Sequence, residues 1–229
     1  MLKKKKSDLE TRNRIYYFIY KHPGLHLREI FRKLDLSEGT IRYHITYLTK
    51  SNLVTKKIED RYTRFYPVAD NIEDADKTII HSFRKEATRN IIFYLLVCGY
   101  GTQQELSKNI KKSPSTVSFH TKKLLKKGII KEANPKNDAL DLNENILNIE
   151  EYEPSGREKV YYLDNPNMIY NFLTEYKEKL FDDETKKDIL NQIDNYIDYK
   201  KSARLEKIQS SVNNYYDLVK EVFSSVINN

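Results

Sequence analysis

The sequence predicts a mostly α-helical fold with small β-hairpins, in which two copies of one domain precede a long helical segment. Gly and Pro number six each in 229 residues, too few for a β-sandwich that turns every ten residues. An internal repeat relates the two halves of residues 10–165. From residue 167 onward the chain contains neither Gly nor Pro, and apolar residues recur at alternating spacings of three and four.

Composition excludes several other classes of protein. The single Cys rules out a disulfide framework and a thiolate zinc cluster. The longest apolar run, residues 91–98, is far too short to cross a bilayer. The lysines at positions 3–6 lead into a polar segment and not into the apolar region of a signal peptide. We therefore expect a cytoplasmic protein that makes no contact with a membrane.

Positive charge is concentrated in the N-terminal half. Residues 1–66 carry 16 basic and 7 acidic side chains, a net charge of +9, and residues 67–131 carry a net charge of +6. The net charge is −6 over residues 132–158 and −2 over residues 159–229. This skew favours a polyanion-binding N-terminal half, although a solvated lysine-rich surface would give the same distribution.

The repeat aligns without a gap at a shift of 76 residues over most of its length. Ile15 lies over Ile91, and residues 40–44 lie over residues 116–120. Farther along, residues 61–66 match residues 157–162 only at a shift of 96. The second copy therefore contains about 20 extra residues, and they coincide with the acidic segment.

Each copy predicts three helices. The first is expected at about residues 8–21 and again at 78–98, where apolar residues recur at helical spacing. The second begins near Leu27 and Gln103, and Thr102 followed by Glu105 has the spacing of a capping box. The third begins at Ser37 or Ser113, with Pro114 at the first helical position.

The third helix and the segment after it complete the domain. Ile41, Ile45 and Leu48 form one buried stripe, which Val117, Thr121 and Leu124 repeat. Asn52 and Gly128 stand where a left-handed cap ends the helix. Residues 53–58 and 63–68 then read as two strands around a charged turn. This order of elements is that of a winged helix-turn-helix. The predicted domains are 1–70, 78–165 with an acidic wing insertion at 132–158, and a helical dimerisation or packing region at 167–229.

A resemblance to a known group of proteins rests on the third helix. Residues 113–124, SPSTVSFHTKKL, resemble the recognition-helix signature of ArsR-like and MarR-like transcriptional regulators, and residues 37–44, SEGTIRYH, are a looser version. The tandem pair over residues 10–165 resembles archaeal regulators. The resemblance implies a protein that binds double-stranded DNA at the nucleoid, with recognition helices at 37–50 and 113–127.

The residues expected to contact DNA lie on the outer faces of these helices and on the first wing. Side chains in the first half of a recognition helix meet base edges, and wing residues meet phosphates or the minor groove. In the first copy they are Glu38, Thr40, Arg42, Tyr43, His44, Thr46, Lys56, Lys57, Arg61 and Arg64. In the second copy they are Ser115, Ser118, Phe119, His120 and Lys122. Arg42 is the strongest candidate for a base contact, because a guanidinium pairs in two places with guanine.

The sequence leaves open whether the second domain binds DNA and whether the protein is a regulator. The acidic segment would be repelled by DNA, so either it folds away from the duplex or the second domain contacts protein. Tandem winged helices also occur as protein-binding adaptors and in replication initiators. His44 and His120 occupy equivalent positions, but their neighbours do not form a metal-ligand set, so we expect neither a metal nor a cofactor. No nucleophile and base stand together, so we expect no enzyme activity.

The C-terminal heptad stripe predicts a helix that must bury one face. We expect it to join two chains into a homodimer, and the alternative is a hairpin that packs on the second domain of the same chain. The residues predicted to make the dimer contact are Leu205, Ile208, Val212, Tyr215, Val219 and Val222.

Overall fold

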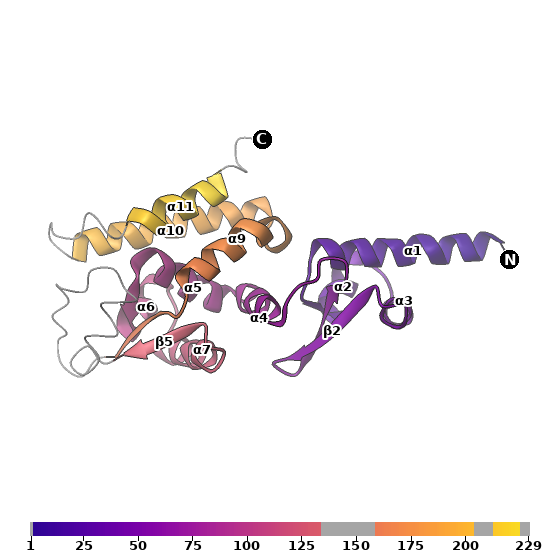
Figure 1. Ribbon diagram of the computed structural model, residues 1–229, viewed down its shortest axis with the longest axis horizontal. Coiled ribbons are helices and arrows are strands. Elements are labelled where there is room, and N and C mark those ends of the chain that lie inside the picture. The colour runs from indigo at the N-terminus through magenta and orange to yellow at the C-terminus, as the bar shows by residue number, and fades with distance from the viewer. Residues whose placement is uncertain (1, 134–158, 204–212, 225–229) are drawn as a thin grey trace. The chain divides into compact units, whose positions relative to one another are not determined.

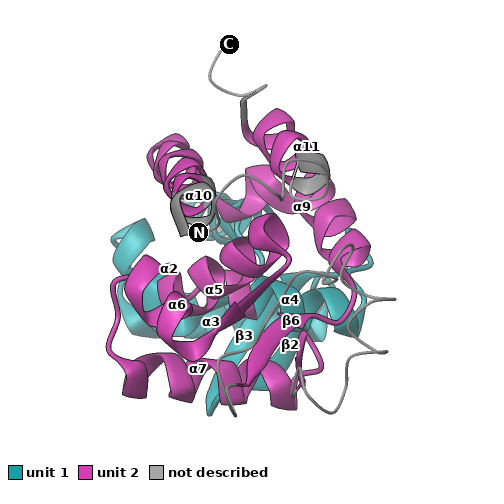
Figure 2. Ribbon diagram, turned by 90° about the vertical axis from the view of Figure 1, so that its left-hand side faces the viewer, with its two compact units in different colours: residues 1–81 teal, residues 82–229 magenta. Residues whose placement is uncertain are grey.

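A computed structural model describes residues 2–133, 159–203 and 213–224 (Figure 1). The chain divides into two compact units, residues 1–81 and 82–229, which are coloured separately in Figure 2. The predicted third region, from residue 167, therefore belongs to the second unit and does not form a unit of its own.

The first unit contains the first copy of the repeat and the helix that follows it. In chain order its elements are α1 (Leu2–Lys21), β1 (Leu25–His26), α2 (Leu27–Leu34), α3 (Glu38–Lys50), β2 (Val54–Glu59), β3 (Tyr62–Pro67) and α4 (Asp74–Phe83), whose last turn crosses into the second unit. The three strands form an antiparallel sheet in the order β1-β3-β2. The predicted winged helix-turn-helix fold is confirmed, and α1 begins several residues before the predicted start.

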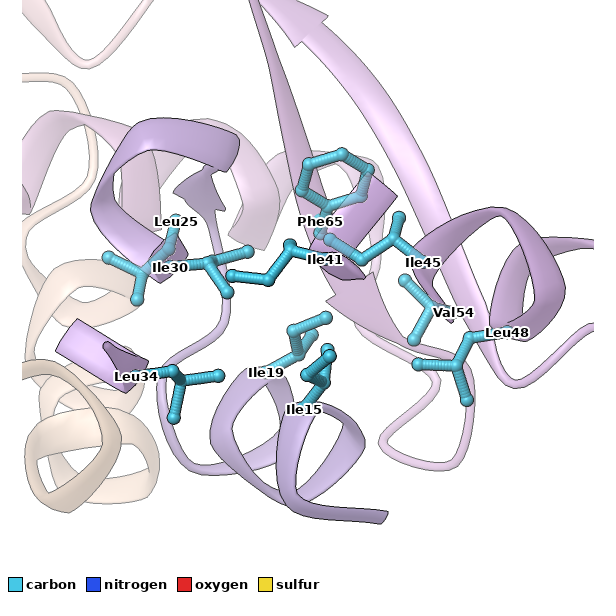
Figure 3. Close-up of a cluster of buried hydrophobic side chains, with 10 residues drawn as sticks. All are labelled: Ile15, Ile19, Leu25, Ile30, Leu34, Ile41, Ile45, Leu48, Val54 and Phe65. Carbon is cyan, nitrogen blue, oxygen red and sulfur yellow. The ribbon is translucent and has the colours of Figure 1, made fainter. Parts of the chain in front are cut away.

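The core of this unit lies between the three helices and the sheet (Figure 3). Ile15 and Ile19 of α1 are fully buried, as is Ile41 of α3. The other members of the cluster are Leu25, Ile30, Leu34, Ile45, Leu48, Val54 and Phe65. The predicted stripe of Ile41, Ile45 and Leu48 is thus the inner face of the recognition helix, and it orients the opposite face toward solvent.

The second unit repeats this arrangement and, in the part of the chain that the structure describes, continues into three helices. Its elements are α5 (Glu86–Cys98), β4 (Tyr100–Thr102), α6 (Gln103–Asn109), α7 (Pro114–Lys126), β5 (Ile130–Ala133), β6 (Val160–Leu163), α9 (Pro166–Leu180), α10 (Asp183–Ala203) and α11 (Asn213–Ser224). Its sheet has the order β4-β6-β5, equivalent to that of the first unit. Thr102 caps α6 by accepting a hydrogen bond from the backbone N–H of Glu105, whose carboxylate accepts one from the N–H of Thr102.

The sheet registers confirm both shifts of the repeat. His26 lies opposite Arg64 in the first sheet, and Thr102 lies opposite Val160 in the second, so the partners are related by shifts of 76 and 96. The predicted insertion therefore enters the second wing between β5 and β6. Most of it, residues 134–158, lies outside the described residues.

The predicted single helix over residues 78–98 is wrong, because two helices occupy this stretch. α4 ends at Phe83, and α5 begins after Lys85, whose extended backbone forms its N-cap. Apolar residues continue at helical spacing through the break, and this misled the prediction. The two halves bury their apolar faces in different cores: Ile79 and Ile80 in the first unit, and Ile91 in the second.

The C-terminal helices cover α5, which is buried on nearly every side. The ring of Phe93 on α5 lies 6.3 Å from that of Phe181 and 5.7 Å from that of Phe223 on α11. Val219 and Val222 are 0% and 6% exposed within the same chain, so their prediction as dimer contacts is wrong. The stripe had to be buried, and α5 supplies the partner surface. Leu205, Ile208, Val212 and the side chain of Tyr215 lie outside the described set.

Across the described parts of the chain, we find no helix that combines the length and the apolar character needed to traverse a bilayer.

Candidate nucleic-acid interface

The recognition helix of the first unit, α3, is fixed at its start by a serine cap. The Ser37 hydroxyl accepts a hydrogen bond from the backbone N–H of Thr40, and the two hydroxyl oxygens lie 2.8 Å apart. Because the cap and the buried stripe set both the start and the rotation of the helix, its outer face is preorganised. The outer face exposes four of the predicted residues, Glu38, Arg42, Tyr43 and Thr46.

Arg42, the predicted base contact, is paired along its own helix. Its Nε donates a hydrogen bond to Glu38 Oε1 at 2.8 Å, with both side chains about half exposed or more (63% and 49%). An exposed pair of this spacing contributes only about 0.3–0.5 kcal/mol. The pair therefore orients the guanidinium on the outer face at low cost, and it exchanges readily for a stronger partner.

His44 does not lie on the DNA-facing surface, so its prediction as a contact is wrong. The residue is 1% exposed, because position 44 falls three residues after Ile41 and joins the inner stripe. Burial, with a smaller contribution from the charge of Arg12, lowers the pKa of His44 below 6.5. An imidazole buried in this way cannot reach a phosphate. The equivalent His120 is partly exposed and stays a predicted contact.

The first wing presents a cationic tip. Asp60 and Arg61 join β2 to β3, and both have positive φ angles (48° and 71°), as two-residue hairpin turns of this kind require. Arg61 at the tip and Lys56 on β2 are exposed. These two residues are therefore placed where a wing meets a phosphate backbone or a minor groove.

Two other cations of the wing are bound within the fold. The predicted DNA contact of the buried Arg64 is wrong, and that of Lys57, whose side chain is 28% exposed, stays a prediction. Arg64 is 4% exposed, and its Nη1 donates a 2.6 Å hydrogen bond to the carbonyl of Gly24. Lys57 lies opposite Arg64 in the ladder, and its ammonium donates to the Asp74 carbonyl at 2.9 Å. Both side chains point to the face of the wing that α4 covers, and the alternation of a hairpin sequence does not reveal which face is covered.

The recognition helix of the second unit, α7, has the same cap and a different outer face. Ser113 accepts a hydrogen bond from the backbone N–H of Thr116, and its hydroxyl lies 2.9 Å from that of Ser115. Phe119 is 56% exposed, and the ammonium of Lys123 lies 4.7 Å from its ring centroid. Lys122 is exposed and Ser118 partly so. All the predicted residues of this helix are therefore accessible.

The root of the second wing pairs opposite charges across its strands. Lys159 donates a 2.9 Å hydrogen bond to Glu132, and this bond raises the pKa of Lys159. Lys131 forms an ion pair with Asp164. In the described part of this wing, these acidic side chains thus lie beside cations.

One feature of the interface was missed by sequence reasoning. The guanidinium of Arg12 on α1 lies 3.5 Å from the ring centroid of Tyr47, an exposed residue of α3. The stacked pair widens the polar, cationic surface beside the recognition helix. Its two residues are 35 positions apart in the sequence, so only the packing of α1 on α3 brings them together.

Comparisons with known proteins agree with this geometry. A family described as "N-terminal HTH domain" matches residues 9–80, and one described as "Winged helix-turn-helix DNA-binding" matches residues 84–131. Both copies are helix-turn-helix domains. The first match spans the first helix-turn-helix domain together with α4 up to residue 80, and the second ends as β5 begins.

A relative carries the same type of domain. Over 139 residues the chain is 30% identical to an uncharacterized HTH-type transcriptional regulator of Methanocaldococcus jannaschii. The aligned part is 60% of this chain and 34% of that protein, so the chain spans about a third of the length of this relative. The similarity therefore covers a part of each protein and not the whole of the relative.

Within the described ranges, no three His, Cys, Asp or Glu side chains gather as a metal site would require.

Proposed function

We propose that this protein is a sequence-specific, double-stranded DNA-binding transcriptional regulator that acts by occupying an operator. The observation that carries the proposal is the outer face of α3, where Arg42, Tyr43 and Thr46 are exposed opposite a fully buried stripe. The relative is named as a transcriptional regulator, and the second family is described as DNA-binding.

Affinity and selectivity come from different residues in this proposal. Lys56 and Arg61 on the wing attract phosphates regardless of sequence, and their contribution falls as salt rises. Arg42 and its neighbours on α3 read base edges in the major groove. When Arg42 moves from Glu38 to a guanine, Glu38 remains beside it and can accept a hydrogen bond from a cytosine amino group.

The second helix-turn-helix domain assists binding through α7. Lys122 and Lys126 are exposed on this helix, and the serines at its start are small enough to allow close approach to the backbone. We therefore propose a contact of both domains with one duplex, at the nucleoid in the cytoplasm.

Fluorescence anisotropy with a mixed-sequence duplex tests this function. We expect binding that weakens by about a thousandfold between 50 and 200 mM salt, as six or more phosphate contacts would give. The double variant Arg42→Ala plus Arg61→Ala should bind more weakly, whereas Lys187→Ala, which removes an exposed cation from α10, serves as the matched control. If the wild type fails to bind at 50 mM salt, the protein is not a DNA-binding regulator, and a protein-binding adaptor becomes the better hypothesis.

We also propose that the regulator is a homodimer, with its contact on α1. Tyr17 and Leu9 of α1 are 63% and 52% exposed. The repeat counterpart of Tyr17 is Phe93, which is 1% exposed because Phe181 and Phe223 cover it. The first copy thus leaves open an aromatic helix face that the second copy covers with helices, and large exposed aromatics are typical of interfaces.

Sedimentation equilibrium tests the dimer. The variant Tyr17→Lys should raise the dimer dissociation constant by about tenfold or more, and Ile58→Lys should leave it unchanged. A wild-type chain that stays monomeric up to 100 µM, or a dimer insensitive to Tyr17→Lys, would contradict the proposed contact.

A further inference from the structure

The two recognition helices share an exposed aromatic residue at the same position. Tyr43 is the sixth residue of α3, and Phe119 is the sixth residue of α7. They are related by the repeat shift of 76, and they are 58% and 56% exposed. Both therefore stand in the half of the helix that meets base edges, although the rest of the two outer faces differs.

Each ring is held in the same way by the residue after it. The Tyr43 ring meets the His44 ring at 69°, with centroids 5.0 Å apart, and the Phe119 ring meets the His120 ring at 81° and 5.2 Å. Such edge-to-face pairs are a favourable geometry for aromatic rings. The imidazole packs edge-on against each ring, and more than half of the surface of Tyr43 and of Phe119 stays exposed. The geometry shared by the two copies assigns the buried His44 a supporting role in place of the predicted DNA contact.

The chemistry of the two side chains limits what they can read. A phenyl ring offers no hydrogen bond, so Phe119 cannot pair with the donors and acceptors of the base edges. In the major groove the one apolar group on a base edge is the 5-methyl group of thymine. Covering a large exposed ring with that methyl group removes apolar surface from water on both partners.

We propose that Tyr43 and Phe119 are specificity-determining residues, each of which contacts the 5-methyl group of a thymine. The inference rests on the proposed function, because it names the base that the two recognition helices select. The polar neighbours then have a separate role: Arg42 reads hydrogen-bonding groups beside the first thymine, and Lys123, 4.7 Å from the Phe119 ring, adds a cation near the second.

The test removes only the methyl group. The preferred duplex is first selected from a randomised pool with the full-length protein, and each thymine in it is then replaced singly by deoxyuridine. We expect one or more replacements to weaken wild-type binding by about fourfold each, the fold-change for losing one buried methyl contact. In Phe119→Ala the loss of affinity on replacement should vanish at the thymine that α7 contacts and persist at the thymine that α3 contacts. In Tyr43→Ala the loss should vanish at the thymine that α3 contacts and persist at the one that α7 contacts. Ile58→Ala should keep every loss.

The outcomes separate this inference from the proposed function. A preferred duplex that contains no thymine, or that tolerates every deoxyuridine within twofold, overturns the thymine contact and leaves the regulator intact. The same holds if the losses of affinity survive in both variants. Binding without any preferred sequence overturns the sequence specificity of the regulator and the inference with it. Both substituted residues are exposed, so the variants should fold, and circular dichroism checks this.

Discussion

Arg61 and Arg64 lie three residues apart on one wing, and the structure predicts opposite consequences for their removal. Arg64→Ala deletes the donor to the Gly24 carbonyl and a cation 3.8 Å from Glu29, both inside the fold. Leaving a buried acceptor without its donor costs about 1–3 kcal/mol. For a unit of this size, each kcal/mol lowers the melting temperature by about 4–8 °C. We therefore expect Tm to fall by about 4–24 °C.

Arg61→Ala should leave stability almost unchanged and weaken DNA binding. Its side chain is exposed at the wing tip, and alanine adopts the left-handed backbone there no less readily than arginine does. Losing one phosphate contact should reduce the slope of log K against log salt by about 0.9. Calorimetry and anisotropy between 50 and 200 mM salt measure the two quantities. An Arg64→Ala protein with an unchanged Tm and a reduced salt slope would refute the assignment of the two arginines.

Three further predictions concern the stability of the two units. Phe223→Ala should destabilise the second unit by about 3–5 kcal/mol in denaturant unfolding, because the Phe223 ring is fully buried against Phe93. An unchanged unfolding midpoint would show that α11 does not cover α5. Wild-type stability should fall as pH drops below 6.5, because burial lowers the pKa of His44 and the unfolded chain therefore binds the proton at a higher pH than the folded chain does. The variant His44→Gln should make Tm less dependent on pH in thermal melts from pH 7 to 5. Curves of Tm against pH that run parallel for the variant and the wild type would contradict this prediction. Thr102→Ala should lower the free energy of unfolding by about 1 kcal/mol, because it removes the N-cap of α6. Thr174→Ala, at an exposed position, should change the free energy of unfolding little, and equal losses in the two variants would argue against the cap.

Features that depend on neighbouring residues were predictable from the sequence. The caps at Ser37 and Ser113 require only a hydroxyl and the next turn of helix. The left-handed residues Asn52 and Gly128 end their helices for an equally local reason. The repeat also predicted a hairpin in each copy, because equivalent sequences form equivalent ladders, whereas the short strands β1 and β4 that complete the two sheets were not predicted.

Features that depend on what packs against an element were not predictable. Arg64 and Arg61 have the same charge and neighbourhood in the sequence, yet only Arg64 is buried, where it contacts Gly24 and Glu29. His44 is polar and sits on a recognition helix, which favoured exposure, but the residue three positions after Ile41 falls inside the core. The stacking of Arg12 on Tyr47 likewise depends on the crossing of two helices.

The sequence by itself determined the tandem winged helices, their recognition helices and the basic character of the N-terminal half. Helical periodicity and capping residues are signals within a short stretch of sequence, and a repeat is found by comparing one stretch with another. All three can therefore be recognised without the tertiary structure. Only the tertiary structure decided which cations face outward and that the helix predicted over residues 78–98 is broken at residues 84–85. It also decided that Val219 and Val222 pack in the core of their own chain. The physical reason is that an apolar stripe specifies that it must be buried, and it does not specify which surface buries it.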